Sequence, residues 1–167
     1  MPPNIERFIN LYQSTNSLGG GAARPSRAFH GEYATVNLAD RHEMTHITID
    51  KMLALHHAII PKFLEAVSFG SPPREAGVPI EYRVPQGARV EVWDSGIKAH
   101  AIAEDTPEAV AERYGVPTWV VAQLNKLVLD EPIGSGKDIV VPRMVFAPTT
   151  ASLPKTPVAS ADRAIRR

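Results

Sequence analysis

Residues 99–142 of the chain read AHAIAEDTPEAVAERYGVPTWVVAQLNKLVLDEPIGSGKDIVVP, and this stretch predicts two short strands that enclose two helices. The strands are expected at residues 100–102 and 139–141, where alternating or consecutive apolar side chains occur. Thr106 followed by Pro107 is typical of a helix start, because the threonine hydroxyl accepts from a free amide and the proline removes only an amide without a helical partner. The expected order is therefore strand, helix, helix, strand.

The ends of the two helices are also marked in the sequence. Gly115 is expected to end the first helix, since glycine adopts the left-handed conformation without strain. Thr118 is expected to cap a second helix over WVVAQLN, and Asn125 to end it, because asparagine tolerates the same conformation. Residues 127–136 are expected to form an irregular loop, and Pro142 to stop the last strand.

The ordered positions of this stretch resemble the LysM domain family over about residues 97–143. Two positions depart from the family pattern, which usually has a glycine at the position of Glu104 and an aromatic residue at that of His100. The resemblance is carried by Glu104-Asp105-Thr106, the run Ala109-Val110-Ala111-Glu112-Arg113-Tyr114-Gly115-Val116, Leu124-Asn125, Gly136 and Ile139-Val140-Val141-Pro142.

LysM modules typically bind glycans that contain N-acetylglucosamine, such as peptidoglycan or chitin, in a shallow groove between two loops. Backbone amides at a helix N-terminus suit acetamide groups, and apolar side chains supply further contact. A module retained only for packing or docking is the alternative. The resemblance implies a glycan-binding or docking groove lined by Glu104, Asp105, Thr106 and Pro107 on one side and by Leu127, Leu129, Asp130, Pro132 and Ile133 on the other.

Composition excludes several classes of protein. The 167 residues suffice for one ordinary domain, or for a small domain with long flanks. The 18 basic and 18 acidic residues balance, so no nucleic-acid partner is expected. The absence of cysteine excludes disulfides, a thiol nucleophile and cysteine-ligated metals. No apolar run approaches the roughly 20 residues that span a bilayer, so no membrane insertion is expected.

Residues 1–31 are interpreted as an N-terminal arm with a connector. Residues 5–12 predict a short amphipathic helix, and residues 13–31 are rich in Ser, Gly, Ala and Pro, which is typical of a flexible or extended connector. The start MPPNIERFINLYQS lacks the basic start and the apolar core of a signal peptide. We therefore expect a protein made in the cytoplasm without a signal peptide, and located in a virion or assembled particle if it is phage-like.

Residues 32–77 are expected to form a helical and mixed segment, which begins with a strand over 32–38. The sequence His42-Glu43-Met44-Thr45-His46 matches the pattern in which two histidines bind zinc and the glutamate activates water. His42 and His46 are thus candidate metal ligands of a zinc-dependent hydrolase. The alternation of residues 45–49 favours a strand instead, so we prefer a chance match and expect no catalytic residue, metal or cofactor.

Residues 51–67, KMLALHHAIIPKFLEAV, predict the longest helix of the chain, with Asp50 as its cap. Pro61 is expected to kink or divide it, because proline lacks the amide for the helical ladder. His56 and His57 lie on this helix, and a metal site, solvated or structural histidines, and a pH-sensitive docking surface are the open interpretations. The apolar stripe of the helix comprises Met52, Leu55, Ile59, Phe63 and Val67, widened by Leu53, Ile60 and Leu64.

The Pro- and Gly-rich residues 69–77 mark a predicted domain boundary. In the next predicted domain, residues 78–146, a strand begins at Ile80, and residues 89–93 are expected to form a β-hairpin with the first LysM strand. Residues 147–167 contain few large apolar side chains and are expected to be disordered or docked on a partner. The predicted fold class is α+β: a small βααβ LysM module with an added β-hairpin, preceded by an N-terminal arm with a long helix.

These features predict a non-catalytic structural or assembly protein that uses a LysM-type module for docking. Proteins that look like this, with one LysM module and no signal peptide, occur among phage tail and baseplate components and related contractile devices. The expected partners are other subunits of a protein assembly. The first alternative is a peptidoglycan-binding protein, and the second is a zinc-dependent hydrolase.

Overall fold

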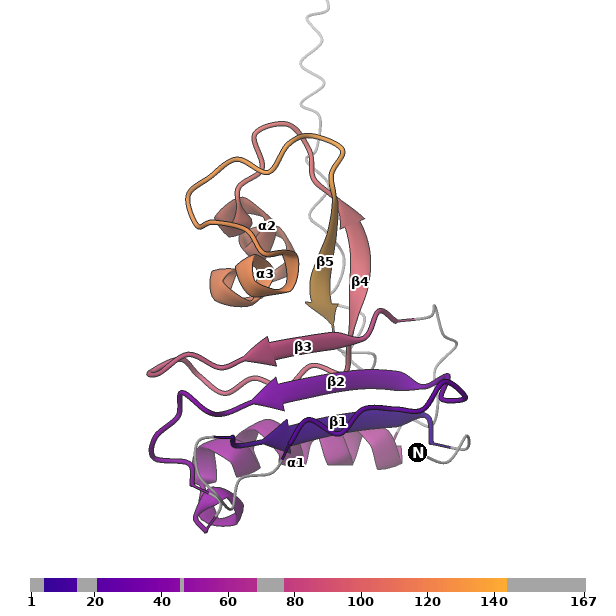
Figure 1. The fold of residues 1–167 in the computed structure, drawn as a ribbon, viewed down its shortest axis with the longest axis vertical. Helices are drawn as coiled ribbons and strands as arrows, with labels where there is room; N and C mark the ends of the chain where they lie inside the picture. Colours follow the sequence, from indigo (N-terminus) through magenta and orange to yellow (C-terminus); the bar gives the residue numbers. More distant parts are fainter. Residues whose placement is uncertain (1–4, 15–20, 46, 69–76, 144–167) are drawn as a thin grey trace, which may run out of the picture.

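A computed structural model of the chain describes residues 5–14, 21–45, 47–68 and 77–143. Within these ranges, three α-helices and two small sheets form a mixed fold that is compatible with the predicted α+β class (Figure 1). The sheet of three strands and the sheet of two strands belong to two layers that meet at strand β3 and helix α3.

The larger sheet contains β1 (Arg7–Tyr12), β2 (Glu32–Asn37) and β3 (Ile80–Arg83), which run parallel in the order β1-β2-β3. The first five residues of β2 are all buried, so this central strand is covered on both faces, as is usual for strands of parallel sheets. The strand expected over residues 32–38 is therefore confirmed.

The expected helix over residues 5–12 is wrong, because this segment forms β1. Its side chains have two periodicities at once: Phe8, Ile9 and Tyr12 share a helical face, while Ile9 and Leu11 share a strand face. So short a helix is marginal in water, whereas pairing with β2 satisfies its backbone along six residue pairs. The partner strand decides the conformation.

Helix α1 (Leu53–Ser68) follows a 3-10 turn at Ile49–Lys51, and the strand expected over residues 45–49 is wrong. Pro61 lies inside α1 without dividing it. The carbonyl left without a donor belongs to the exposed residue His57, four residues earlier, where water can replace the lost bond. Figure 1 shows α1 running along the sheet on the side of β1.

The second layer is built from β4 (Ser95–His100), α2 (Pro107–Tyr114), α3 (Thr118–Asn125) and β5 (Asp138–Arg143). The strands pair antiparallel, with Ala99 opposite Ile139, and both helices lie on one side of them (Figure 1). Two expected boundaries are wrong. The first strand, expected at residues 100–102, is β4 and ends at His100, and β5 continues through Pro142, which the structure places opposite Gly96.

Residues 84–94 contain no strand, so the hairpin expected from residues 89–93 is wrong. Strand β4 pairs with β5 along one edge, and Val78 forms an isolated bridge with Gly96 on the other. The segment is held instead by a side chain, because the Tyr82 hydroxyl donates to the Glu91 carbonyl at 3.0 Å and accepts from the Trp93 amide at 3.2 Å.

Helix α3 belongs to both hydrophobic cores. Val120 packs with the buried residues of the parallel sheet and α1, such as Val36 and Leu55. The next residue, Val121, packs with Val110 of α2 and the buried residues of β4 and β5. Adjacent residues of a helix point about 100° apart, which allows one short helix to join the two layers.

Candidate functional site

The turn before α2 is organised around the carboxylate of Asp105, which is only 3% exposed. One oxygen accepts the Ile102 amide at 2.8 Å, and the other pairs with the Arg113 guanidinium from the last turn of α2. Donors of the protein itself therefore engage both oxygens. Asp105 holds the loop in shape and has no exposed surface for a ligand.

Local signals set the bounds of α2 as predicted. The Thr106 hydroxyl accepts from the Ala109 amide at 3.2 Å, Pro107 is the first helical residue, and Gly115 ends the helix with φ 65°. The expected caps of α3 are wrong, because Pro117 precedes it without a side-chain cap and Lys126 is its left-handed C-cap, with φ 53°.

The backbone is left-handed at three non-glycine residues in the described part of the chain. Glu104 and Asp130 each have a φ of 66°, and Lys126 has the φ of 53° already noted. This conformation costs an ordinary residue roughly 1–2 kcal/mol. All three residues lie in the loops beside α2 and α3, so these loops hold a tight shape that glycine would adopt more easily.

Backbone hydrogen bonds join the two loops that were predicted to flank a groove. The Ile133 amide donates to the Asp105 carbonyl at 2.6 Å, and the Gly136 amide donates to the Ala101 carbonyl at 2.7 Å. The Ile133 side chain is 3% exposed and packs with Val110 in the second core. The loops thus form one continuous surface.

The structure places the predicted groove residues at different depths. Asp105, Pro107 and Ile133 are buried, so they support the loops from below. Thr106 and Leu127 are half-buried. Only four of the predicted residues are fully at the surface: Glu104, Leu129, Asp130 and Pro132.

Sequence reasoning missed two exposed apolar residues on the same loops. Ile102 is 59% and Val128 is 60% exposed, comparable with Leu129 at 50%. Ile102 was expected in the strand over residues 100–102, although the Asp-Thr-Pro helix start that follows it is a signal for a loop. We call Ile102, Val128 and Leu129 the loop patch.

The zinc-hydrolase pattern lies in a turn rather than a helix in its described part, residues 42–45. His46 lies outside the described residues. The Glu43 carboxylate accepts from Arg41 Nε at 2.7 Å, and its own backbone amide and Arg41 hold the pKa of Glu43 below its usual value, which makes it a weaker base. Among the described residues, no group of three or more His, Asp or Glu side chains is placed to hold a metal ion.

A second surface of interest lies on α1. Five large apolar side chains of this helix are at least 36% exposed, and Phe63 reaches 66%. Only Leu55 of α1 is buried among the side chains described. Monomeric proteins rarely expose many large apolar side chains together. We call Leu53, Ile59, Ile60, Phe63 and Leu64 the α1 apolar face.

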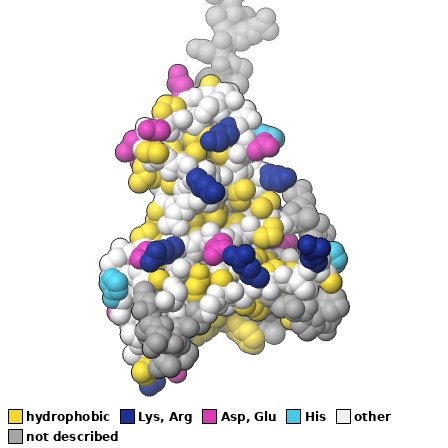
Figure 2. All heavy atoms as spheres, viewed as in Figure 1, with side chains coloured by type: hydrophobic (Ala, Val, Ile, Leu, Met, Phe, Trp, Pro, Cys, Tyr) yellow, Lys and Arg dark blue, Asp and Glu magenta, His cyan; other side chains and the backbone are white. Residues whose placement is uncertain are grey.

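Figure 2 shows basic and acidic side chains interspersed on the face that it presents. None of the described helices is both long and apolar enough to cross a membrane. Comparison of the chain with protein-family models, curated proteins and solved structures gives no match.

Proposed function

We propose that the chain is a non-catalytic structural protein of a larger assembly, in which residues 97–143 form a LysM-type docking module. A tail or baseplate component of a phage or related contractile device is the kind of assembly that fits the sequence resemblance. The partners in this proposal are other subunits, and the place of the protein is the assembled particle.

The geometry of residues 95–143 supports the LysM-type proposal. The order β4, α2, α3, β5 and the antiparallel pairing of the two strands agree with the strand-helix-helix-strand pattern. Glu104 stands where the family usually has glycine, and its φ of 66° is a conformation that favours glycine. A glycine at this position would adopt the observed backbone conformation without strain.

The α1 apolar face is the observation that carries the assembly proposal. Five large side chains on one helix cost free energy when they face water, at roughly 25 cal/mol for each Å² of apolar surface. Their burial against another subunit would recover that free energy. An exposed apolar face of this kind is typical of a surface that binds a partner.

Peptidoglycan binding is the second candidate function, and the loop patch favours it. Its apolar side chains lie on the two loops that the sequence resemblance assigns to a glycan groove. Asp105 is an unsuitable position for testing this function, because loss of its carboxylate would disturb the loops whatever they bind. A surface substitution on the loop patch is the cleaner variant.

The two candidates are tested together with Phe63→Glu on α1 and the double variant Val128→Ala, Leu129→Ala on the loop patch. Sedimentation velocity over a concentration series measures association, fluorescence of an apolar dye measures the exposed face, and co-sedimentation with purified sacculi measures glycan binding. We expect concentration-dependent association and dye binding of the natural chain, both reduced by Phe63→Glu and unchanged by the double variant.

The opposite pattern would favour the second candidate. A monomer that binds no dye, but co-sediments with sacculi until Val128 and Leu129 are replaced, contradicts the assembly proposal. Far-UV circular dichroism of each variant controls for folding. Because all three residues are exposed, their replacement is expected to leave the fold intact.

A further inference from the structure

Strand β1 is an open edge of the parallel sheet in the described part of the chain. The sheet has the order β1-β2-β3, and β1 pairs along one side, with β2. All six residues of β1 are partly exposed. The opposite edge of the sheet differs, because the side chain of Gln123 bonds to both backbone groups of Arg83 in β3. The edge of β1 therefore offers backbone groups for further pairing.

The hydrogen bonds to β2 show which groups of β1 point outward. The carbonyls of Glu6, just before the strand, and of Tyr12, its last residue, each accept at 2.8 Å from an amide at or next to an end of β2. Successive residues of a strand direct their backbone groups to opposite sides, so Ile9 and Leu11 face away from β2. The amides and carbonyls of these two residues form no hydrogen bond within the described part of the chain.

The sequence of β1, RFINLY, lacks the features that usually protect an edge strand. Proline, lysine and bulges serve this purpose in many proteins. Strand β1 contains no proline or lysine, and its register with β2 is unbroken. Its one charged residue, Arg7, is bound to Asp94 at 3.2 Å. An edge of this kind pairs readily with a further strand.

Helix α1 extends past the same edge. Ile9 and Leu11 pack against the core that contains Leu55 of α1. Figure 1 shows α1 passing behind β1 and continuing below it, on the side away from β2. The sheet is thus too narrow to cover the helix, whose apolar face stays exposed. A fourth strand beside β1 would place alternate side chains on the face of Ile9 and Leu11, and so cover part of α1.

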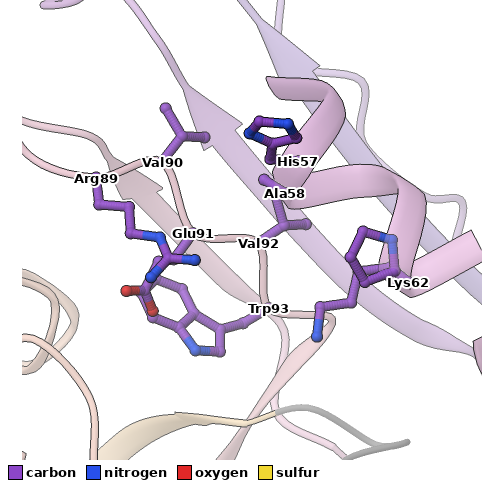
Figure 3. A pocket seen from close by; sticks show the side chains of 9 residues that line it. His57, Ala58, Lys62, Arg89, Val90, Glu91, Val92 and Trp93 are labelled. Atoms are coloured by element: carbon purple, nitrogen blue, oxygen red, sulfur yellow. The ribbon is translucent and has the colours of Figure 1, made fainter. Parts of the chain in front are cut away.

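The packing of α1 against its other neighbour is also loose. A cavity of about 300 Å³ lies between α1 and residues 89–93 (Figure 3). Its lining residues include Ala58 and Pro61 of α1 and none of β1. Helix α1 therefore makes incomplete contact on both sides, and a strand bound next to β1 would add contacts on one of them.

We propose that the open edge of β1 binds an extended segment of a partner protein as a fourth strand, next to α1. The backbone of this segment pairs with the amides and carbonyls of Ile9 and Leu11. Its alternate apolar side chains cover the part of α1 that projects beyond β1. Main-chain bonds give affinity and side-chain contacts give specificity in this mode of recognition. The inference rests on the proposed assembly function and names the chemistry of a partner.

A second copy of this chain is a less suitable occupant. Antiparallel pairing of two β1 strands would place both α1 helices on the same face of one continuous sheet. Paired strands lie about 4.8 Å apart, whereas packed helices need about 8–10 Å between their axes. Because α1 extends past β1 (Figure 1), the two helices would come too close. A strand that brings no helix of its own fits this edge.

The C-terminal residues of the same chain are also less suitable. Pro148, Pro154 and Pro157 interrupt the first part of residues 144–167, and proline cannot donate to a strand ladder. The last part carries Arg163, Arg166 and Arg167, which do not match an apolar helix face. An apolar strand from another protein fits the chemistry better.

The test selects random peptides on the full chain by phage display and measures their affinity by fluorescence anisotropy. We expect the selected peptides to carry Val, Ile, Leu or Phe at alternate positions over about six residues. Their binding should slow the hydrogen exchange of the Ile9 and Leu11 amides by about tenfold or more, measured by NMR. The internal control is the Asn10 and Tyr12 amides, which face β2 and should exchange slowly with and without peptide.

Two matched comparisons test the backbone pairing. Methylation of the peptide amides that face β1 should weaken binding by about tenfold or more, while methylation of the alternate amides should leave it unchanged. Leu11→Pro removes one outward amide at a position where an edge strand tolerates proline. It should bind the peptides about tenfold more weakly than Leu11→Ala, which retains the amide.

Peptide binding without protection of the Ile9 and Leu11 amides, or equal affinity of the two methylated sets, would overturn the proposal. Slow exchange of these amides in the dilute free chain would overturn it too, by showing that the edge is already paired within the chain. Protection that rises with protein concentration in the absence of peptide would identify a second copy instead. Failure to select any peptide, beside association that Phe63→Glu reduces, would remove the edge site and leave the assembly proposal standing.

Discussion

Single residues explain most of the shape of the loops beside α2. Asp105 collects the Ile102 amide and the Arg113 guanidinium, and Thr106 caps the helix that follows. Each of these contacts joins two residues that are at most eight positions apart in the sequence. Such short-range contacts explain why this turn could be predicted from the order Glu-Asp-Thr-Pro.

Glu104→Gly is expected to stabilise the protein. Its φ of 66° is strained for glutamate, and glycine removes the strain while adding some entropy to the unfolded chain. The net gain should be about 0.5–1 kcal/mol in the free energy of unfolding, measured by urea denaturation.

The control for this substitution is Glu108→Gly, which replaces the same exposed residue type in the first turn of α2. There the backbone is helical, so glycine should cost about 1 kcal/mol. Equal losses for the two variants would show that Glu104 carries no strain.

At the scale of elements, side-chain amides of α3 bind the backbone of one strand in each layer. Gln123 accepts from the Arg83 amide at 3.0 Å and donates to its carbonyl at 2.9 Å, which covers the free edge of β3. Asn125 does the same for Val140 of β5, at 2.6 and 2.8 Å. Each amide imitates one residue of a neighbouring strand.

Asn125→Leu is expected to destabilise the protein by about 2 kcal/mol. The amide and the carbonyl of the half-buried Val140 would both lose the hydrogen bond that Asn125 provides. Hydrogen exchange of the Val140 amide should become faster than that of other β5 amides. The control is Gln123→Leu, at an exposed contact where water can replace the lost bonds, with an expected loss of less than about 1 kcal/mol. Unchanged exchange at Val140 would contradict this role of Asn125.

At the scale of the whole molecule, two ion pairs also connect the layers. Arg7 of β1 pairs with Asp94 at 3.2 Å, and Arg143 at the end of β5 pairs with Glu32 of β2 at 3.3 Å. The carboxylates are almost fully buried, with side-chain exposures of 0% for Asp94 and 4% for Glu32. Arg143 Nε also donates to the Ser95 hydroxyl at 3.0 Å.

Arg143→Met is expected to destabilise the protein by about 3 kcal/mol, since it leaves Glu32 buried without this cation. Calorimetry should show unfolding that is less cooperative, because the layers lose part of their connection. The double variant Glu32→Leu, Arg143→Met removes both charges and should recover part of the loss. A double variant as unstable as the sum of the single ones would contradict a direct pairing.

The parts that could not be predicted share a physical cause. Residues 7–12 form a strand because β2, more than twenty residues away, pairs with them. Residues 89–93 form no strand. The Tyr82 hydroxyl bonds to the backbone of Glu91, and β4, the strand expected to pair with this segment, pairs with β5 instead. The candidate surfaces were predicted only in part, since exposure of Ile102 and burial of Ile133 depend on how the two loops meet.

The amino-acid sequence by itself determined α2, the presence of α3 and the main part of β5, because helical hydrogen bonds and caps join residues a few positions apart. Tertiary structure alone decided the parallel sheet, the role of α3 between the layers and the cavity beside α1. Parallel strands take all their backbone partners from distant segments, and a cavity exists only where such segments meet. No local pattern contains that information.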